Sequence, residues 1–592
     1  MTFYRERIAT LSEELKLLER KFLVFYFLRL VTFIGFVGFG IWMASTGVVW
    51  QGVVSGLLFM AFLWIVKLDL KWVKHQRLLK SRLEVNQNEL KFLAFDFSDF
   101  DSGEEFLKIN PHLAGDFDVF GDHSLYQYIS RSVLHSGRTK LANRLCSQEL
   151  SPDIIKERQE AIKELSSLPQ FLEDFQALGQ LNRETGQEQR NLQLWLNTSI
   201  HSLVPTWLLW LYPGLVMVWI VLVASSVIPG GTILLLIVIA FGIVFGKKKA
   251  VDAIHNQLGK SAQNFGVYEQ LIHLVENQAF QSAYLVQLQA HFTRGSQRAS
   301  LSVRQLYGLL EKFDYRYNLV VAILLNLVGL FDLQMVRLLG KWKTKHRLEV
   351  ISWLETLSDL DAINGLARFA MNNREQLSYP ELSNETFEYS AVEMGHPLIS
   401  ADTRINNDVH FCGQPKIIVV TGANMAGKST FLRTLAVNLI LAMNGAPVVA
   451  QSFRFTPCAI MSSINIRDSL SHKASYFYSE LLRIREIIDY VKIHPQTLVI
   501  LDEILRGTNT KDKQAGSLGL LDKLVAMNAL VVIATHDLTI GEMDKKYPEI
   551  VSNHCFEVEL EGDQLVFDYK LKSGVSQKLN ASFLMRQMGV IE

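Results

Sequence analysis

The sequence predicts a multidomain protein, with α-helical membrane and core regions followed by an α/β domain toward its C-terminal end. Three observations support this fold class. Two pairs of long apolar runs lie in the first half of the chain, polar helix-forming segments surround them, and a glycine-containing strand–loop–helix pattern follows at 417–436. A chain of 592 residues is long enough for several domains.

The overall composition is neutral. Lys and Arg together number 59, as do Asp and Glu, so the formal net charge is zero. The net charge gives no indication of a nucleic-acid partner, although a local basic patch is compatible with a net charge of zero. The four cysteines, Cys146, Cys412, Cys458 and Cys555, lack metal-ligand spacing and are expected to be reduced thiols in a cytosolic environment.

The N-terminal region, residues 1–95, is predicted to carry a transmembrane hairpin. No charged residue occurs over the 20 positions of 30–49 or the 15 positions of 52–66. Twenty helical residues span about 30 Å, the thickness of the hydrocarbon layer. We therefore expect spans at about 30–49 and 50–66, with a second, polar helix at 67–95. The alternative, a pair of buried core helices, lacks the polar face that a soluble helix needs.

A second transmembrane hairpin is predicted at about 207–228 and 232–245. Pro229, Gly230 and Gly231 join the two apolar runs and favour a tight turn. Buried core helices are again the alternative reading, and the missing polar face again argues against them.

The distribution of basic residues predicts the orientation of both hairpins. The connectors 45–52 and 225–232 carry no Lys or Arg, whereas basic residues flank the hairpins: Arg5, Arg7, Lys16, Arg20, Lys21, Lys67, Lys71, Lys74, Arg77, Lys80, Arg82, Lys247, Lys248 and Lys249. The positive-inside rule puts the connectors outside. We therefore expect a multi-pass membrane protein with four spans and with both termini and the α/β domain in the cytoplasm.

A fifth apolar stretch, 319–331, is only 13 residues long. It is too short to span comfortably, and an odd number of spans would put the α/β domain on the wrong side. We predict a buried helix here, and whether the stretch touches the membrane stays open.

The loop from Thr421 to Thr430 follows a β-branched apolar run and precedes a helical pattern. This is the context that a phosphate-binding P-loop, or Walker A motif, requires. Gly422 and Gly427 let successive backbone N–H groups face one anion, and the helix N-terminus adds its positive end. Lys428 would reach the phosphates of ATP and the Ser429 hydroxyl would ligate Mg²⁺.

A second buried strand, 498–501, ends in Asp502 and Glu503, 74 residues after Lys428. In this Walker B arrangement, Asp502 would hold Mg²⁺ and Glu503 would orient and deprotonate the attacking water; the alternative is an acidic turn after a strand. A third buried strand, 530–535, ends at His536, which would sense the γ-phosphate unless it is a structural histidine.

Four blocks together resemble the ATPase domain of the MutS mismatch-repair proteins. They are 421–430 (TGANMAGKST), 475–480 (SYFYSE), 502–510 (DEILRGTNT) and 534–536 (ATH). The Asn-Met pair in the loop, and Arg506-Gly507-Thr508 after the carboxylates, are more specific than a generic P-loop. Gly395-His396-Pro397 also looks like the family's lead-in to this domain.

The resemblance implies a P-loop ATPase of the ABC-like class, MutS domain V, that converts ATP and water to ADP and phosphate. The nucleotide-binding residues would be Thr421, Gly422, Ala423, Asn424, Met425, Ala426, Gly427, Lys428, Ser429 and Thr430, with Ser475 reaching the ATP of a second subunit. ATP-dependent homodimerisation follows. Glu503, His536 and Lys428 would be catalytic, and Ser429 and Asp502 would hold Mg²⁺.

Weaker similarity extends upstream over the MutS core, from 124–165 to Asp359-Leu360-Asp361-Ala362. The expected domains are therefore the N-terminal helices 1–95, an acidic linker 96–118, a helical core and lever region 119–375, and the ATPase domain 376–592.

The chain departs from the family pattern at several places. The first 118 residues hold no mismatch-recognition or connector domain, and the lever region, 191–289, rises into an apolar hairpin instead of a basic DNA clamp. Leu505 and Lys513 replace glycines common near the Walker B loop, and the stretch before Ser475 lacks its usual glycine. The family's C-terminal helix-turn-helix is also not found.

These features predict a membrane-anchored MutS-like ATPase whose ATP cycle moves the levers, with lipid as one partner. The family label is DNA mismatch repair, and DNA binding stays possible but doubtful. An ABC-type transport or membrane-remodelling motor is the alternative, although the last three spans hold no Asp, Glu, Lys or Arg and the LSGGQ signature is missing. A nucleotide-sensing scaffold without DNA activity is a further alternative, and a protein client is unknown.

Overall fold

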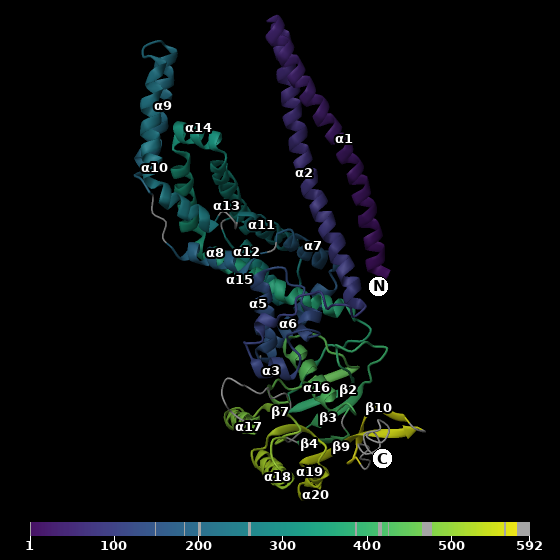
Figure 1. Ribbon diagram of the computed structural model, residues 1–592. Helices are drawn as coiled ribbons and strands as arrows, with labels where there is room; N and C mark the ends of the chain where they lie inside the picture. Colours follow the sequence, from purple (N-terminus) through teal and green to yellow (C-terminus); the bar gives the residue numbers. More distant parts are fainter. Residues whose placement is uncertain are drawn as a thin grey trace.

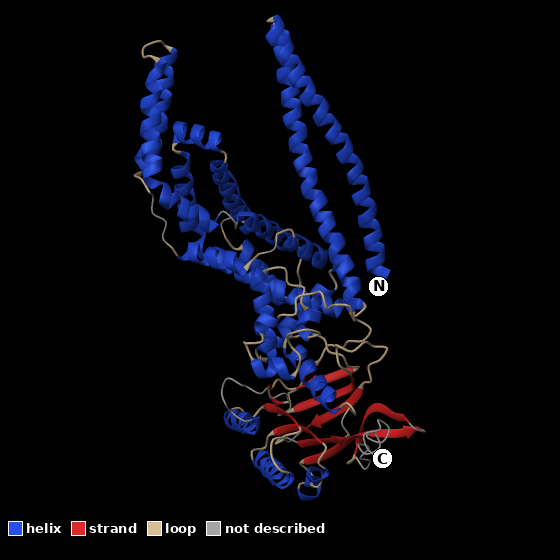
Figure 2. Cartoon of the chain, in the orientation of Figure 1, coloured by secondary structure: helices blue, strands red, loops and turns tan. Residues whose placement is uncertain are grey.

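The computed structural model describes residues 2–148, 150–182, 184–198, 203–258, 262–295, 297–384, 387–412, 417–423, 425–464, 476–561 and 564–576. Helices make up the first two thirds of the chain, and the sheets gather in the C-terminal third (Figure 2). Two helical hairpins project from a helical core on the side away from the sheets (Figure 1). The multidomain, mixed α and α/β class expected from the sequence is thus confirmed.

The first hairpin consists of α1 (Thr2–Thr46) and α2 (Val49–Leu93), each 45 residues long. The helices turn at Gly47, whose φ of 69° lies in the left-handed region that favours glycine. The polar helix expected at 67–95 is wrong as a separate element, because it is the continuation of α2. No proline or glycine occurs between Gly56 and the end of α2 at Leu93, so the helical hydrogen bonds continue without a break.

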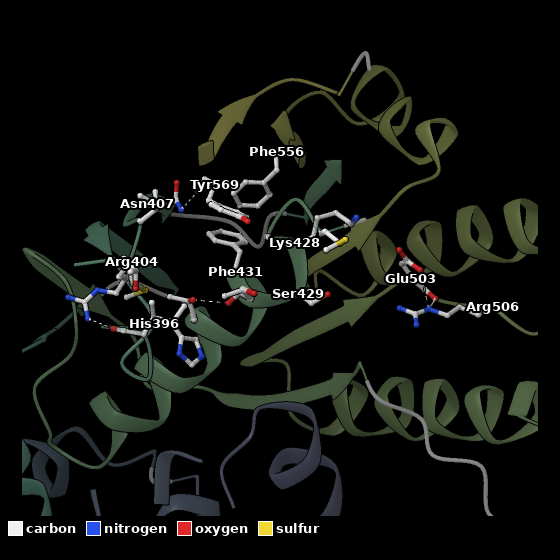
Figure 3. Close-up of a pocket in the computed structure, with 18 residues that line it drawn as sticks. His396, Arg404, Asn407, Lys428, Ser429, Phe431, Glu503, Arg506, Phe556 and Tyr569 are labelled. Carbon is white, nitrogen blue, oxygen red and sulfur yellow. Dashed lines mark hydrogen bonds and ion pairs between the residues drawn. The ribbon is translucent and has the colours of Figure 1, made fainter. Parts of the chain in front are cut away.

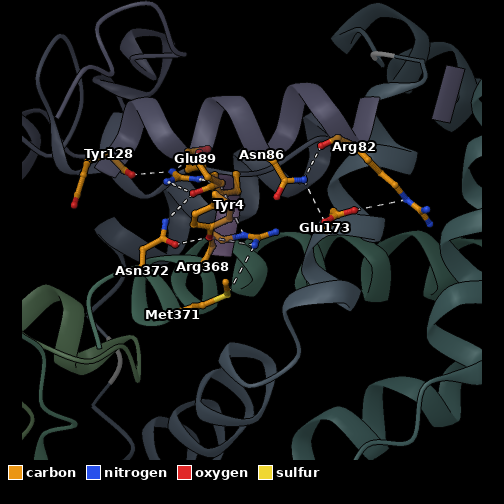
Figure 4. Close-up of polar contacts among 11 residues, drawn as sticks. Tyr4, Arg82, Asn86, Glu89, Tyr128, Glu173, Arg368, Met371 and Asn372 are labelled. Atoms are coloured by element: carbon orange, nitrogen blue, oxygen red, sulfur yellow. Dashed lines mark hydrogen bonds and ion pairs between the residues drawn. The ribbon is translucent and has the colours of Figure 1, made fainter. Parts of the chain in front are cut away.

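The base of this hairpin is fastened to the core by a buried polar network (Figure 4). Glu89 on α2 is fully buried and accepts hydrogen bonds from Arg131 Nε at 2.7 Å and Asn372 Nδ2 at 2.7 Å. Tyr4 on α1 donates to Asn372 Oδ1 at 2.5 Å. Since buried charges persist only when paired and hydrogen-bonded, these contacts hold α1, α2 and the core in one arrangement.

The connection between the hairpin and the core, 96–118, is packed rather than extended. It contains η1 (Glu104–Phe106) and α3 (Pro111–Asp116), and the side chains of Phe97, Phe106 and Phe117 are buried. The acidic composition of the segment predicted a linker, but three of its phenylalanines and the side chain of Asp116 are buried against the core.

The helical core is built around α15 (Phe331–Asn372), which is 42 residues long. The shorter helices around it are α4 (Leu125–Ile129), α5 (His135–Cys146), α6 (Pro152–Ser166), α7 (Pro169–Gln180), α8 (Gly186–Asn197), α11 (Ala262–Asn277), α12 (Ala283–Thr293) and α13 (Ala299–Phe313). The buried carboxylate of Asp361 on α15 accepts N–H bonds from Val133 and Leu134 at the start of α5. This contact satisfies backbone donors that a helix N-terminus leaves free.

The second hairpin consists of α9 (Thr206–Ala224) and α10 (Ile233–Leu258), with η2 (Gly230–Thr232) at its turn. Few of its apolar side chains are buried, and about half of the large ones are exposed. Within the described residues, four helices (α1, α2, α9 and α10) are long and apolar enough to cross a membrane, or five if a bent pair, α14 and α15, counts as one span.

The fifth apolar stretch forms α14 (Leu319–Gly329), and the predicted buried helix is wrong. All of its residues are described and none is buried. The helix meets α15 at a bend of 78°, with Leu330 in the left-handed region at φ 50°. The bend turns α14 out of the core, so its high apolar content does not place it inside.

The C-terminal α/β region contains a six-stranded sheet in the order β10-β9-β4-β8-β7-β6. Its strands are β4 (Ile417–Gly422), β6 (Ala459–Ser463), β7 (Thr497–Asp502), β8 (Leu530–Thr535), β9 (Val551–Glu561) and β10 (Gln564–Ser573). All neighbours are parallel except β9 and β10. Val420 pairs with Ala534, and Asp502 pairs with Ala534 on the other side of β8, so the carboxyl ends of three strands meet at one edge.

A smaller sheet, in the order β1-β5-β2-β3, lies beside the large one. Its strands are β1 (Glu381–Leu382), β2 (Glu388–Met394), β3 (Asn407–Cys412) and β5 (Ser452–Phe455). The helices of the region are α16 (Lys428–Met443), α17 (Tyr476–Ile493), α18 (Thr510–Ala526), α19 (Leu538–Gly541) and α20 (Met543–Lys546). A separate apolar cluster joins α17 and α18 to the large sheet.

The helical core joins the α/β region through a shared apolar cluster and several polar contacts. Ser462 on β6 donates to Asp116 Oδ2 at 2.7 Å, and Arg433 on α16 donates to the Asp116 carbonyl at 3.0 Å. Gln148 donates to the carbonyl of Ile460 at 2.8 Å. Both the sheet edge and α16 therefore contact the core directly.

Candidate functional site

A cavity of about 610 Å³ opens at the carboxyl edge of the large sheet (Figure 3). The loop between β4 and α16, here called the glycine loop (residues 421–430), lines its floor. Lys428 and Ser429 lie in the middle of the view, with Glu503 and Arg506 on one side and His396 and Arg404 on the other. Ligands bind at this edge of open parallel sheets because loops and helix N-termini converge there.

Two glycines allow the glycine loop to take its path. A Cβ on Gly422 would lie 2.7 Å from the carbonyl oxygen of Phe556, which is too close for any side chain. Gly427 has a φ of 103° and lies against the ring of Tyr569. Both positions therefore require glycine on steric grounds.

Lys428 is the first residue of α16, and its buried ammonium group closes the glycine loop. Its Nζ donates to the carbonyl oxygens of Gly422 at 2.8 Å and Ala423 at 2.9 Å. Burial lowers the pKa of Lys428 from its usual value, while Glu503 and Asp502 oppose this effect. A cation at a helix N-terminus, beside free backbone N–H groups, is suited to bind an anion such as phosphate.

Ser429 and Asp502 bring two oxygen ligands together. The Ser429 hydroxyl donates to Asp502 Oδ2 at 2.6 Å, and burial raises the pKa of the Asp502 carboxyl, an effect that the Ser429 hydrogen bond opposes. Among the residues described, no group of three or more His, Cys, Asp and Glu side chains could hold a metal ion. Hydroxyl and carboxylate oxygens fit Mg²⁺, which usually takes few protein ligands and completes its shell with water and phosphate oxygens.

Glu503 lies at the mouth of the cavity with two basic neighbours. Its carboxylate is 3.3 Å from Arg506 Nε and 3.3 Å from His536 Nδ1. The backbone N–H of Glu503 donates to the Ala534 carbonyl at 2.9 Å, and its φ is 44°, a conformation uncommon for residues other than glycine. The backbone thus leaves the strand ladder here and turns the carboxylate toward the cavity.

The residues that the sequence indicated divide into three groups. Met425, Gly427, Lys428, Ser429, Thr430 and Glu503 line the cavity. Six further residues are described but do not line it: Thr421, Gly422, Ala423, Ala426, Asp502 and His536. The Thr421 hydroxyl donates to the His554 carbonyl at 3.3 Å and accepts from the Ser576 N–H at 3.0 Å. Asn424 and Ser475 lie outside the described residues.

The cavity has a second wall that no motif indicated. It includes Arg404 before β3, Asn407 on β3 and Tyr569 on β10. The Asn407 side chain joins these strands: Nδ2 donates to the Tyr569 carbonyl at 3.0 Å, and Oδ1 accepts from the Leu571 N–H at 2.7 Å. A bulge between Phe567 and Leu571 places Tyr569 over the glycine loop.

Glu480 on α17 supports the segment after Glu503. Its buried carboxylate accepts the Leu505 N–H at 2.5 Å, and burial raises its pKa, against hydrogen bonds from Leu505 and Arg506. Leu505 has a φ of 59°. This left-handed conformation favours glycine, the residue that Leu505 replaces here. The block 475–480 was noted in the sequence, but this contact was not foreseen because α17 lies outside the strand pattern.

The fold and site define an α/β domain in which a parallel sheet presents a glycine loop, a lysine and paired carboxylates at one edge. Residues 418–586 match the family model for MutS domain V. A DNA mismatch repair protein MutS from Thermotoga maritima is 29% identical over 238 residues, which cover 40% of this chain and 29% of that protein. MutS protein homolog 4 from Homo sapiens is 30% identical over 202 residues, 32% of this chain and 21% of that protein.

The C-terminal domain is therefore a member of the MutS domain V family. The chain matches less than a third of the length of these curated relatives. The family-model match lies within the α/β region, and both hairpins lie outside that match.

Proposed function

We propose that this protein is a membrane-anchored ATPase that binds ATP with Mg²⁺ at the glycine loop and hydrolyses it to ADP and phosphate. One observation carries the proposal: Lys428 and Ser429 at the start of α16 and Glu503 directly after β7 line one cavity, and Asp502 at the end of β7 accepts the Ser429 hydroxyl behind it. A buried cation, two oxygen ligands suited to Mg²⁺ and a carboxylate in the cavity are the groups that phosphoryl transfer requires.

The chain's own groups account for binding. The N–H groups of the glycine loop and the first turn of α16 face the phosphates, and Lys428 Nζ exchanges its two carbonyl acceptors for phosphate oxygens. Magnesium, held by Ser429 and Asp502, would neutralise phosphate charge. The Phe431 and Phe556 rings, 5.7 Å apart, form an apolar part of the same cavity.

Glu503 is proposed as the base of the hydrolytic step. Its carboxylate takes a proton from water as the water oxygen attacks the γ-phosphorus, and the bond to the ADP oxygen breaks. Arg506 and His536, each 3.3 Å from this carboxylate, orient it.

The proposal includes a homodimer formed through the ATPase domains. The resemblance assigns Ser475 to the ATP of the other subunit, and proteins of the MutS family act as dimers. Binding of ATP by two chains would join them, and hydrolysis would release them.

The membrane part of the proposal rests on α1, α2, α9 and α10, which are long and apolar enough to span. Motion at the cavity can reach them through two sets of contacts. Arg433 on α16 contacts Asp116 and Asp118 of the core at 3.0 and 2.9 Å, and the network around Glu89 joins the core to the first hairpin.

The test of the enzymatic part is Glu503→Gln in lipid nanodiscs. The variant should bind ATP like the unmodified protein but hydrolyse it about 10²- to 10⁴-fold more slowly, because a positioned general base contributes this much. Glu542→Gln, at an exposed position, is the matched control. If Glu503→Gln hydrolysed ATP at the rate of the unmodified protein, Glu503 would not be the general base.

The membrane part is tested by fractionating a detergent-free lysate. The intact chain should sediment with membranes and resist extraction by alkaline carbonate, as spanning helices do. Recovery in the soluble fraction would refute the anchor and leave the ATPase assignment standing.

A further inference from the structure

Helix α14 presents a fully aliphatic stripe away from the protein. Its most exposed side chains are Leu319, Val320, Ile323, Leu324 and Val328. Their spacing puts them on one face of the helix. A helix on a water-soluble surface carries polar residues on its outward face. The aliphatic stripe therefore fits an apolar environment better than water.

The opposite face of α14 packs against α9, α10 and α15. In Figure 1, α14 lies across the direction of the α9–α10 hairpin, close to its lower part. The stripe is therefore continuous with the exposed apolar surface of α9 and α10, which the proposed function places in lipid.

Backbone groups at the ends of α14 are satisfied by side chains of the protein. At the N-terminus, Asn318 Oδ1 accepts the Val321 N–H at 3.2 Å. At the C-terminus, the Tyr212 hydroxyl donates to the Leu327 carbonyl at 2.9 Å, and Gln334 Nε2 donates to the Gly329 carbonyl at 2.7 Å. Such pairing is what a helix needs in hydrocarbon, where water does not solvate free N–H and C=O groups.

The length of α14 excludes a full crossing of the bilayer. Eleven residues are about 16 Å long at 1.5 Å per residue, roughly half the hydrocarbon thickness, and the helix lies across the hairpin rather than along it (Figure 1). Helix α13 leads into α14 and α15 leads out of it, and both belong to the same helical core. The chain therefore enters and leaves on one side.

Polar and aromatic groups mark an interfacial level at the foot of α14. Tyr315 and Tyr317 are exposed in η4 (Asp314–Tyr317), and Arg316 pairs with Asp252 of α10 at 2.6 Å. Trp210 of α9 is also exposed, with the Arg337 guanidinium 5.7 Å from its ring centre. Tyrosine, tryptophan and arginine gather where hydrocarbon meets the head groups.

We propose that α14 is a re-entrant helix that inserts its aliphatic stripe into the cytoplasmic leaflet of the bilayer that α9 and α10 cross. The inference rests on the membrane part of the proposed function and adds a lipid-contact site to it. The bend at Leu330 then joins this lipid-inserted helix to α15, which runs through the core toward the ATPase domain. Lipid contact at α14 thereby sets the position of the N-terminal end of α15.

The test places a fluorescent, environment-sensitive label on single cysteines and measures quenching by spin-labelled lipids in nanodiscs. Cys412 is the exposed native cysteine among the described residues, and Cys412→Ser removes it. Burial raises the pKa of the Cys146 and Cys458 thiols to about 12 and also raises the pKa of Cys555, so these three react slowly with the label.

Three labelled positions are compared in this background. Leu324→Cys reports α14, and Val218→Cys on α9 is a matched control, since both native side chains are 56% exposed. Leu348→Cys, on α15 and 80% exposed, reports a site in water. Spin labels near the lipid head group and near the chain end distinguish shallow from deep insertion.

We expect the label at 324 to be quenched as strongly as that at 218, and more by the shallow spin label than by the deep one. Quenching at 218 but not at 324 would overturn this inference alone, as would quenching at 324 by the deep label only. If a second copy of the chain covered α14 instead of lipid, the label at 324 would escape quenching by the spin-labelled lipids and would show self-quenching, which would also overturn the inference. Absence of quenching at all three positions would overturn the membrane anchor as well.

Discussion

At the scale of single residues, the candidate site depends on side chains that hold backbone in uncommon conformations. Lys428 closes the glycine loop by binding two of its carbonyl oxygens. Glu503 and Leu505 both have positive φ, at 44° and 59°, and Glu480 accepts the N–H of Leu505. Strain of this kind persists where the surroundings hold it, and it is concentrated at functional sites.

Substitution of Lys428 by alanine tests the anion-binding role. Lys428→Ala removes a charge and two hydrogen bonds, each worth about 1.5–3 kcal/mol when a charged group takes part. We expect ATP affinity to fall at least about 100-fold in equilibrium binding. Lys511→Ala, at an exposed position on α18, should leave affinity unchanged. Equal affinities for Lys428→Ala and the unmodified protein would defeat the assignment.

His396 provides a pH-dependent contribution to stability. Burial, reinforced by Arg433 and Arg404, lowers the pKa of His396 from 6.5 to about 4, and its Nδ1 accepts the Leu398 N–H at 3.2 Å. The unfolded chain therefore binds more protons between these two values, and stability falls as the pH drops from about 6.5 to about 4, by up to about 3 kcal/mol.

The measurement is scanning calorimetry between about pH 5 and pH 7. His396→Gln should weaken the dependence of the melting temperature on pH, whereas His410→Gln, at an exposed position, should keep it. An unchanged slope in His396→Gln would show that His396 is not held neutral by the fold.

At the scale of elements, the length of an apolar run predicts a helix, but it does not predict whether that helix is buried in the protein or exposed. The runs at 30–66 became the distal halves of α1 and α2, while the proximal, more polar halves pair with each other around Leu11, Leu18 and Leu79. Helix α14 has the composition of a core helix and yet buries none of its residues. The bend at Leu330 decides this outcome, and it is a property of the junction with α15.

The base of the first hairpin offers a prediction at this scale. Arg131→Met should destabilise the docking of α2 by about 3–5 kcal/mol, because it leaves Glu89 buried with one partner fewer. Hydrogen exchange of amides in 84–93 measures this local stability. The double variant Glu89→Gln/Arg131→Met should recover only part of the loss, because the buried Arg368 then loses its carboxylate partner Glu89, 3.9 Å away.

Lys91→Met is the control for this cycle, since Lys91 is half exposed and its pairing with Asp99, at 3.8 Å, is a surface ion pair. Such a pair contributes about 1 kcal/mol or less. Should Arg131→Met exchange no faster than Lys91→Met, the network would not hold the hairpin.

At the scale of the whole molecule, the two hairpins and the candidate site lie at opposite ends of the helical core (Figure 1). The relatives are named for DNA mismatch repair, and their similarity to this chain covers the α/β region. The formal net charge of zero and the apolar hairpins suit lipid better than a polyanion.

We therefore predict that DNA does not govern the ATPase rate. The rate in nanodiscs should be the same without DNA and with homoduplex, mismatched or branched DNA at low salt, where contacts with phosphates are strongest. Lys428→Ala sets the background rate. Stimulation by mismatched DNA over homoduplex would instead support a mismatch-repair activity.

Much of the α/β region could be predicted from the sequence because its signals are local. The strands before Thr421, Asp502 and His536 are short apolar runs, and the glycines mark the turn into α16. The wall formed by Asn407 and Tyr569 could not be predicted, because these residues are 162 positions apart and meet through a hydrogen bond between two sheets.

The sequence by itself determined the strand–loop–helix of the candidate site and the positions of the apolar runs that form helices, since both follow from periodicity and backbone hydrogen bonding within a few residues. Tertiary structure alone decided that Glu89 pairs with Arg131 and Asn372, that the segment 96–118 is packed, and that α14 faces outward. These outcomes depend on which distant surfaces come together, and the free energy of burial is a property of that assembly and not of any one segment.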